Sequence, residues 1–261
     1  MRVDRPAESE DSAVQVSEPL PKENQLLPQA SDFQYMGSEL EIFAHATNWK
    51  SYVHSKLHPY LVGDVLEVGA GIGGTTQVFK NGRQRRWVCL EPDSGFAEQI
   101  RSSHHLRNCE VVEGMLPDLG PDEKFDSILY MDVLEHIEDD AGELALAAEH
   151  LKPNGAIAVL APALPWLYTA FDEAIGHYRR YTRNSLRAAF PKDMREEECM
   201  YLDAFGVLAS AGNLLFLQSP AATQGQMRFW DNCLVPISRF ADGMLFHSFG
   251  RSILSVWRKP S

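Results

Sequence analysis

A short apolar run followed by a glycine-rich turn constrains this chain more than any other part of its sequence. Residues 65–68 read Val-Leu-Glu-Val, which is the short, largely apolar kind of run that a buried parallel strand needs. Glycines recur over residues 69–74 and allow a sharp turn with a close approach of the backbone to a ligand. Thr75 is a candidate N-cap for a helix with an apolar face that begins at residues 78–79. A strand, a glycine turn and a helix together form a nucleotide-binding arrangement.

Two acids indicate which nucleotide this turn holds. Gly69, Gly71 and Gly74 satisfy the G-x-G-x-x-G pattern of dinucleotide binders, but such a match alone is weak. Glu67 would point into the ligand crevice, where it would repel a pyrophosphate and hold an ammonium or a sulfonium. Glu91 follows at about the ~20-residue distance of an acid that accepts from ribose hydroxyls. The alternatives are a carboxylate that caps a nearby amide for Glu67 and an exposed strand end for Glu91. Together the acids favour a cationic adenosyl ligand.

Three motifs in order, VLEVGAGIGGTT, CLEPD and FDSILYMDVLEHIEDD, resemble the class I S-adenosylmethionine-dependent methyltransferases. The resemblance covers roughly Asn48 to Phe190. It implies a Rossmann-like methyltransferase fold with a seven-stranded sheet and S-adenosylmethionine as the cofactor. The cofactor-binding residues predicted from these motifs are Glu67, Gly69, Ala70, Gly71, Gly73, Thr75, Glu91, Met115, Leu116 and Asp132.

Length and charge limit what kind of protein this is. With 261 residues, 44% of them hydrophobic, the chain can bury one α/β core. The acidic, polar segment 1–30 is predicted to be a disordered tail, which leaves 31–261 as one methyltransferase domain. A net charge of −12 argues against nucleic-acid binding. The four cysteines have no metal-finger spacing, and neither a signal peptide nor a transmembrane run is visible, so we expect a cytoplasmic location.

Periodicity predicts strands that alternate with helices, and therefore an α/β, doubly wound, mostly parallel sheet. A helix is expected over Glu39–Leu61, and the segment Phe205–Leu217 is expected as a buried helix. A membrane surface or a second subunit remains an alternative partner for that second segment. One strand of the carboxy-terminal part cannot be placed from the sequence. The placed strands lie near 65–68, 87–91, 109–112, 125–131, 156–160 and 252–257, and a turn is expected at 153–155.

The turn that begins at Gly114 departs from the family pattern. In the family this turn lies beside the adenine ring, and many members carry an acid after the glycine. Here the next residues are Met115 and Leu116. Apolar contact with the ring, or an acceptor such as Asp118, would have to replace that acid.

An aromatic and basic insert, Ala161–Phe190, follows the fifth strand. A loop with this composition suits binding better than folding. Its arginines suit a carboxylate or a phosphate on the acceptor, although they could instead pair with surface acids.

In the family, the helix before the first strand covers the cofactor, so aromatic residues there are candidate lid residues, with core packing as the alternative. The predicted acceptor-side residues are Trp49, Tyr52, Trp166, Tyr178, Arg179, Arg180 and Tyr181.

Two histidines are the candidate catalytic residues. Methyl transfer from a sulfonium mainly needs alignment, and a base is required only if the acceptor must lose a proton. His136 follows the fourth strand at the crevice and His177 lies in the aromatic-basic insert, although either could instead be a structural loop residue. Asp132, Glu135 and His136 resemble the set with which ubiquinone-pathway O-methyltransferases hold a divalent metal. Many relatives carry this string without metal, so no metal is expected.

The predicted function is methylation of a small-molecule acceptor, at oxygen. GHYRRYT and SVWRKP are similar to bacterial methyltransferases encoded among sugar- and lipid-modifying or secondary-metabolite enzymes. That resemblance implies a secondary metabolite or a glycan- or lipid-linked precursor as the acceptor. The alternatives are an NAD(P)-dependent oxidoreductase and a non-catalytic scaffold with this fold. The oligomeric state and a peripheral membrane contact stay open.

Overall fold

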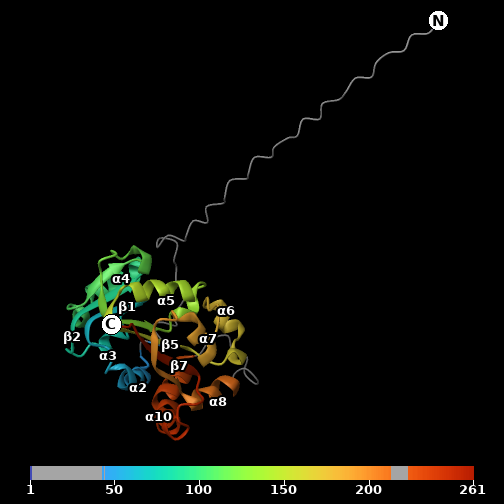
Figure 1. The fold of residues 1–261 in the computed structure, drawn as a ribbon. Helices are drawn as coiled ribbons and strands as arrows, with labels where there is room; N and C mark the ends of the chain where they lie inside the picture. Colours follow the sequence, from blue (N-terminus) through green and yellow to red (C-terminus); the bar gives the residue numbers. More distant parts are fainter. Residues whose placement is uncertain (2–42, 44, 213–222) are drawn as a thin grey trace.

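A computed structural model describes residues 1, 43, 45–212 and 223–261, and it shows a seven-stranded sheet with helices on both faces (Figure 1). The strand order is β3-β2-β1-β4-β5-β7-β6, so that β1 pairs with both β2 and β4. The order reverses beside β1, which makes the carboxyl ends of β1 and β4 the topological switch point of the sheet. The strands are β1 (Gly63–Val68), β2 (Gln84–Glu91), β3 (Glu110–Glu113), β4 (Phe125–Met131), β5 (Leu151–Pro162), β6 (Arg195–Leu202) and β7 (Ser252–Arg258).

The sheet is mixed, so the expected mostly parallel pairing holds for β1 to β5 and not for the carboxy-terminal part. The pairs among β1 to β5 are parallel, whereas β7 runs antiparallel to both β5 and β6. Ser252 starts β7 opposite Pro162 and Leu202, which end their own strands. The chain therefore leaves β6 and enters β7 at the same end of these strands. An antiparallel strand can start there without a connection that crosses a face of the sheet. The helices between β6 and β7 therefore begin and finish near the carboxyl ends of the parallel strands.

Alternating side chains divide the core between the two faces of the sheet. Val65 and Trp87 pack with residues of α2 and α3 on one face, whereas Leu66 and Ile128 pack with residues of α5 and α7 on the other. The helices are α2 (Thr47–Leu57), α3 (Thr76–Phe79), α4 (Ser94–Ser102), α5 (Asp140–Glu149), α6 (Ala170–Ala174), α7 (Arg183–Ala189), α8 (Ala204–Gly212), α9 (Gln224–Phe229) and α10 (Val235–Met244).

Most predicted elements are present with shifted ends. β4 has the predicted bounds, and β5 begins earlier because residues 152–155, with the predicted turn, form a bulge between the pairs Phe125–Leu151 and Ser127–Ala156. The predicted helix 39–61 is described as α2 from Thr47 onward. Residues 2–30 of the predicted tail and residues 213–217 of the segment 205–217 lie outside the described residues.

The amino-terminal end of α2 is capped from a distant part of the chain. Its own N-cap residue, Ala46, has no side-chain acceptor. Asp231, in the π-helical turn Trp230–Leu234, accepts the backbone N–H of Trp49 at 2.8 Å and that of Asn48 at 3.2 Å. A carboxylate there satisfies free N–H groups and interacts favourably with the helix dipole. The carboxy-terminal helices therefore fix the position of α2.

A second buried carboxylate completes this connection. Asp242 on α10 accepts the hydroxyl of Tyr52 at 2.9 Å and the backbone N–H groups of Asp203 and Ala204 at 2.7 and 2.9 Å. It thereby caps α8 while it holds α2. No helix within the described ranges is long and apolar enough to cross a membrane.

Candidate functional site

The glycine turn after β1 has the backbone that its sequence predicts. Gly69, Gly71 and Gly73 have φ values of 65°, 55° and 77°, a region that favours glycine. A Cβ atom at Gly69 would lie 2.7 Å from a methyl carbon of Val133, so a side chain there would also clash. α3 starts after Thr75 as predicted, although the Thr75 side chain makes no capping hydrogen bond and the helix has only four residues.

Glu91 ends β2 beside this turn. Its Oε2 atom accepts the backbone N–H of Gly71 at 2.6 Å, and its Oε1 atom accepts that of Asp93 at 2.9 Å. The side chain is buried, so the interpretation as an exposed strand end is wrong, and burial raises the pKa of the carboxyl. Each carboxylate oxygen can accept a second hydrogen bond. Glu91 is therefore positioned to accept from a ligand while it holds the glycine turn.

Glu67 is held beneath the turn. Its Oε2 atom accepts the hydroxyl of Thr76 at 2.6 Å and the indole N–H of Trp87 at 2.9 Å. Burial raises the pKa of Glu67 to about 7, although these two hydrogen bonds and the charge of Lys50 act in the opposite direction. One of its two oxygens is therefore used by protein side chains, neither of which is the nearby amide of the alternative interpretation.

Asp132 follows β4 at the switch point with a φ of 54°, in the left-handed region. Its backbone N–H donates to the carbonyl oxygen of Leu160 at 2.9 Å. Its side chain keeps access to solvent, yet enclosure by the protein raises the pKa to about 6, partly offset by His177, Arg251 and Lys50. A carboxylate that is both enclosed and accessible suits a polar ligand group.

Lys50 on α2 is a candidate site residue that the sequence analysis did not name. Its side chain is buried, and Nζ donates to the carbonyl oxygen of Phe43 at 2.9 Å. Burial lowers its pKa to about 8, whereas the charges of Glu67, Asp231 and Asp132 raise it. The available signal was a lysine between Trp49 and Tyr52 on the predicted buried face of the helix.

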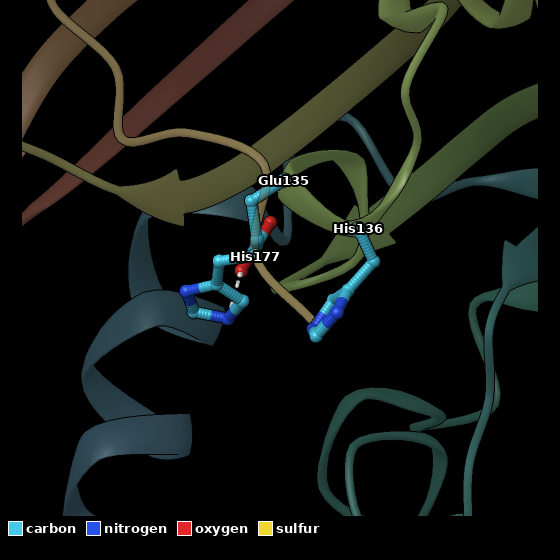
Figure 2. Close-up of side chains that lie close together, drawn as sticks. All are labelled: Glu135, His136 and His177. Carbon is cyan, nitrogen blue, oxygen red and sulfur yellow. Dashed lines mark ion pairs between the residues drawn. The ribbon is translucent and has the colours of Figure 1, made fainter. Parts of the chain in front are cut away.

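The two predicted catalytic histidines lie together. Their rings, from separate segments, have centroids 4.6 Å apart at 76°. His136 belongs to the 3₁₀ turn Leu134–His136 after β4, and His177 follows α6. Nε2 of His177 lies 3.7 Å from Oε1 of Glu135, and the backbone N–H of Tyr178 donates to the Glu135 carbonyl oxygen at 2.8 Å. Figure 2 shows the three side chains gathered at one place, with the ion pair between His177 and Glu135.

Asp172 supports this cluster from behind and was not predicted. Its Oδ1 atom is 3.0 Å from Nδ1 of His177. Arg180 donates to both of its oxygens, at 2.8 and 3.1 Å, and Thr169 donates its backbone N–H at 2.9 Å. Although burial acts against it, the hydrogen bonds from His177 and Arg180 hold the pKa of Asp172 well below its usual range. A D-x-x-x-x-H spacing was the signal in the sequence.

Burial shifts the pKa values of Glu135 and His136 away from those of exposed side chains. Glu135 has no exposed surface, and neither of its carboxylate oxygens has a hydrogen-bond partner within the described ranges. Burial raises the pKa of Glu135 well above its usual range. Burial also lowers the pKa of His136 to about 4, in the same direction as the charge of the neighbouring His177. At neutral pH His136 is therefore an uncharged imidazole.

The predicted acceptor-side residues fall into three groups. Trp166 and Tyr178 are more than half exposed. Arg179 pairs with Asp140 as the alternative named for the arginines expects, whereas Arg180 pairs with Asp172, which is buried and not a surface acid. The third group, which comprises Trp49, Tyr52 and Tyr181, is buried, and this favours core packing over a lid for the first two.

The turn expected beside adenine contains Met115, half-buried, and Leu116, fully buried. Oδ2 of Asp118 accepts the backbone N–H of Met115 at 2.8 Å and closes this turn. Asp118 is thus used as a local cap, and the turn offers an apolar surface through Met115.

Comparisons with known proteins agree with this geometry. Residues 66–157 match the family model described as a methyltransferase domain, and this segment contains the glycine turn and β4. No curated protein matches the chain at a significant level.

Solved structures share the fold at low sequence identity. A Galdieria sulphuraria protein designated a sarcosine dimethylglycine methyltransferase has a TM-score of 0.54 and 16% identity, and the match covers 82% of this chain and 84% of that chain. The N-methyltransferase NodS from Bradyrhizobium japonicum, in complex with S-adenosylhomocysteine, has a TM-score of 0.54 and 12% identity over 86% and 92% of the two chains. The [4+2]-cyclase SpnF has a TM-score of 0.53 and 15% identity over 80% and 81%.

These neighbours show the fold, and the cyclase shows that this fold also serves another reaction. The matched methyltransferase domain supports methyl transfer as the reaction of this chain. Residues 66–157 therefore carry a methyltransferase domain, and this domain together with the fold supports an S-adenosylmethionine-dependent methyltransferase.

Proposed function

We propose that this methyltransferase methylates a hydroxyl oxygen of a small molecule, either a secondary metabolite or a glycan- or lipid-linked precursor. The observation that carries the proposal is the pair His136 and His177, which the fold brings together after β4. A hydroxyl is a poor nucleophile until it loses its proton, so a site for oxygen needs groups that promote this loss. We assign that activation to the histidine pair.

On the cofactor side, we assign the ribose hydroxyls to Glu91, because its bonds to Gly71 and Asp93 fix it at the end of β2. Met115 supplies apolar contact to the adenine ring. The buried ammonium of Lys50 suits the carboxylate of the methionine moiety, and Asp132 suits its ammonium.

On the acceptor side, we assign contacts to the exposed rings of Trp166 and Tyr178. Arg180 acts through Asp172 as a positioning residue, since its guanidinium holds both oxygens of that carboxylate. Such contacts supply the alignment that methyl transfer requires. The O–CH₃ bond forms as the S–CH₃ bond breaks, sulfur keeps the electron pair as S-adenosylhomocysteine, and the hydroxyl proton passes to the histidine pair.

A reducing compartment suits this protein. The four cysteines, Cys89, Cys109, Cys199 and Cys233, are all free thiols in the structure. This supports the proposal of a cytoplasmic enzyme, because such thiols persist under reducing conditions.

Release of S-adenosylhomocysteine tests the proposal. Pairs of acceptors that differ only in hydroxyl against amine, at the same carbon of sugars, lipids and phenols, separate oxygen from nitrogen. We expect turnover with a hydroxyl member and a loss of 10²-fold or more in His177→Ala, on the order of a general-base contribution. His105→Ala, which alters an exposed histidine in another region, is the matched control. Turnover of amines alone would overturn the assignment to oxygen.

A further inference from the structure

We propose that Glu135, His136 and His177 form a binding site for one divalent transition-metal cation. The three donor atoms, a carboxylate oxygen and two ring nitrogens, lie within 4.8 Å of one another. They come from two segments, the turn after β4 and the loop after α6, which the fold brings together (Figure 2). The inference departs from the sequence-based expectation, which names no metal.

The buried carboxylate of Glu135 favours a bound cation. Glu135 has no exposed surface, and neither oxygen has a hydrogen-bond partner within the described ranges. A buried carboxyl without hydrogen bonds costs free energy of folding, and the cost is larger when the group is charged. A cation held by that carboxylate would remove the cost, since buried charges are normally paired or bound to metal.

The distance between the donor atoms of His177 and Glu135 also fits a shared ion. Nε2 of His177 lies 3.7 Å from Oε1 of Glu135, which is too long for a hydrogen bond. Two donors at about 2.0–2.2 Å from one tetrahedral ion are separated by roughly 3.3–3.6 Å. The observed separation is therefore close to that of two ligands of a common ion.

The hydrogen-bond partners around His177 suit a metal ligand. A metal-ligating histidine almost always donates its other ring N–H to a carboxylate, which fixes the tautomer. Nδ1 of His177 lies 3.0 Å from Oδ1 of Asp172, and this leaves Nε2 on the Glu135 side. Arg180 in turn fixes Asp172 through two hydrogen bonds, so the orientation is rigid.

The donor set selects the class of cation. Imidazole with carboxylate suits zinc, manganese, iron, cobalt or nickel, whereas Mg²⁺ and Ca²⁺ prefer oxygen ligands alone. Three protein ligands leave at least one coordination position for water or a substrate oxygen. If the proposed function holds, on which this one step rests, the histidine pair activates the acceptor hydroxyl through the cation that it holds.

The test measures binding alone, so that it stays separate from turnover. The full chain, without a histidine tag, is dialysed against a chelator and titrated calorimetrically with ZnCl₂, MnCl₂ or CoCl₂, without cofactor or acceptor. We expect one ion per chain for zinc or cobalt, with visible d–d absorption for Co²⁺. Affinity should fall by 10²-fold or more in His177→Ala and in Glu135→Gln. Asp172→Asn, which alters only the support of His177, should lose 10–100-fold.

His105→Ala is the control and should bind as the parent protein does. Circular dichroism checks that each variant is folded, and His136→Ala replaces any ligand variant that is not. No saturable binding of any of the three ions, or equal affinity in the parent and the ligand variants, would overturn the metal site. Intact binding with no turnover of any hydroxyl acceptor would instead contradict the proposed function alone.

Discussion

The carboxylate of Glu91 accepts the backbone N–H of Gly71 at 2.6 Å and joins the end of β2 to the glycine turn that follows β1. The side chain that shapes the turn is therefore also the one that we propose as the acceptor for the ribose hydroxyls. This relationship connects the stability of the turn with the affinity for the cofactor.

Glu91→Gln should weaken binding of S-adenosylhomocysteine by about tenfold or more. The amide keeps the size of the side chain but has only one acceptor oxygen for Gly71, Asp93 and the ribose, and loss of a hydrogen bond to a charged group costs roughly 1.5–3 kcal/mol. Calorimetric titration measures the change. Glu98→Gln, on the exposed side of α4, serves as the control. An unchanged dissociation constant would remove Glu91 from the cofactor site.

Glu67 should make stability depend on pH in a defined direction. Its pKa is raised from the ordinary 4.5 to about 7 in the folded protein. Between these values the folded protein holds a proton that the unfolded chain has lost, so the free energy of unfolding falls as pH rises. The contribution is on the order of 3 kcal/mol, from 1.36 kcal/mol per pKa unit.

Urea denaturation of the parent protein and of Glu67→Gln at several pH values measures this effect, because the glutamine does not titrate. The stability of the parent relative to the variant should decline from about pH 4.5 to about pH 7 and then level off. A relative stability that is constant, or that rises with pH, would show that Glu67 is not held in an environment that disfavours its charge.

Asp231→Ala should destabilise the fold although the residue lies far in sequence from the helix that it caps. The change removes the acceptor for the N–H groups of Asn48 and Trp49, and loss of a helix cap costs about 0.5–2 kcal/mol. The midpoint of thermal unfolding measures the loss. Asp122→Ala, in an exposed turn, should leave it unchanged. Equal midpoints for both variants would mean that α2 does not depend on the carboxy-terminal helices.

Two tyrosines of the same loop should behave differently. Tyr178 is 54% exposed, so Tyr178→Ala should leave stability within about 0.5 kcal/mol and raise KM for the acceptor. The hydroxyl of the buried Tyr181 donates to Asp140 at 2.8 Å, so Tyr181→Phe should cost about 1 kcal/mol. Steady-state kinetics and denaturation separate the two. A destabilised Tyr178→Ala with unchanged KM would reverse the assignment.

The strands near the glycine turn were predictable because their signals are local. The apolar run of β1 and its glycines carry their own conformational requirement, and β4 has the predicted bounds. The direction of β7 was not predictable, since an isolated apolar run does not specify the orientation of its neighbours.

The site was predictable only in part, for the same reason. His136 and His177 could each be named from residue type and position, and the fold brings them together. The roles of Asp172 and Lys50 depend on contacts and burial that only the folded chain creates. The lack of hydrogen bonds to the Glu135 carboxylate within the described ranges also has no signature in the sequence.

Thermal unfolding with added ligands tests most directly whether the site around Gly71 and Glu91 binds S-adenosylmethionine. S-adenosylmethionine and S-adenosylhomocysteine, at about 100 times the dissociation constant, should each add roughly 2.7 kcal/mol of stability and raise the melting temperature. NAD and NADP should have no effect, and the rise should shrink in Glu91→Gln. A rise with NAD or NADP and none with the two sulfur compounds would contradict the account.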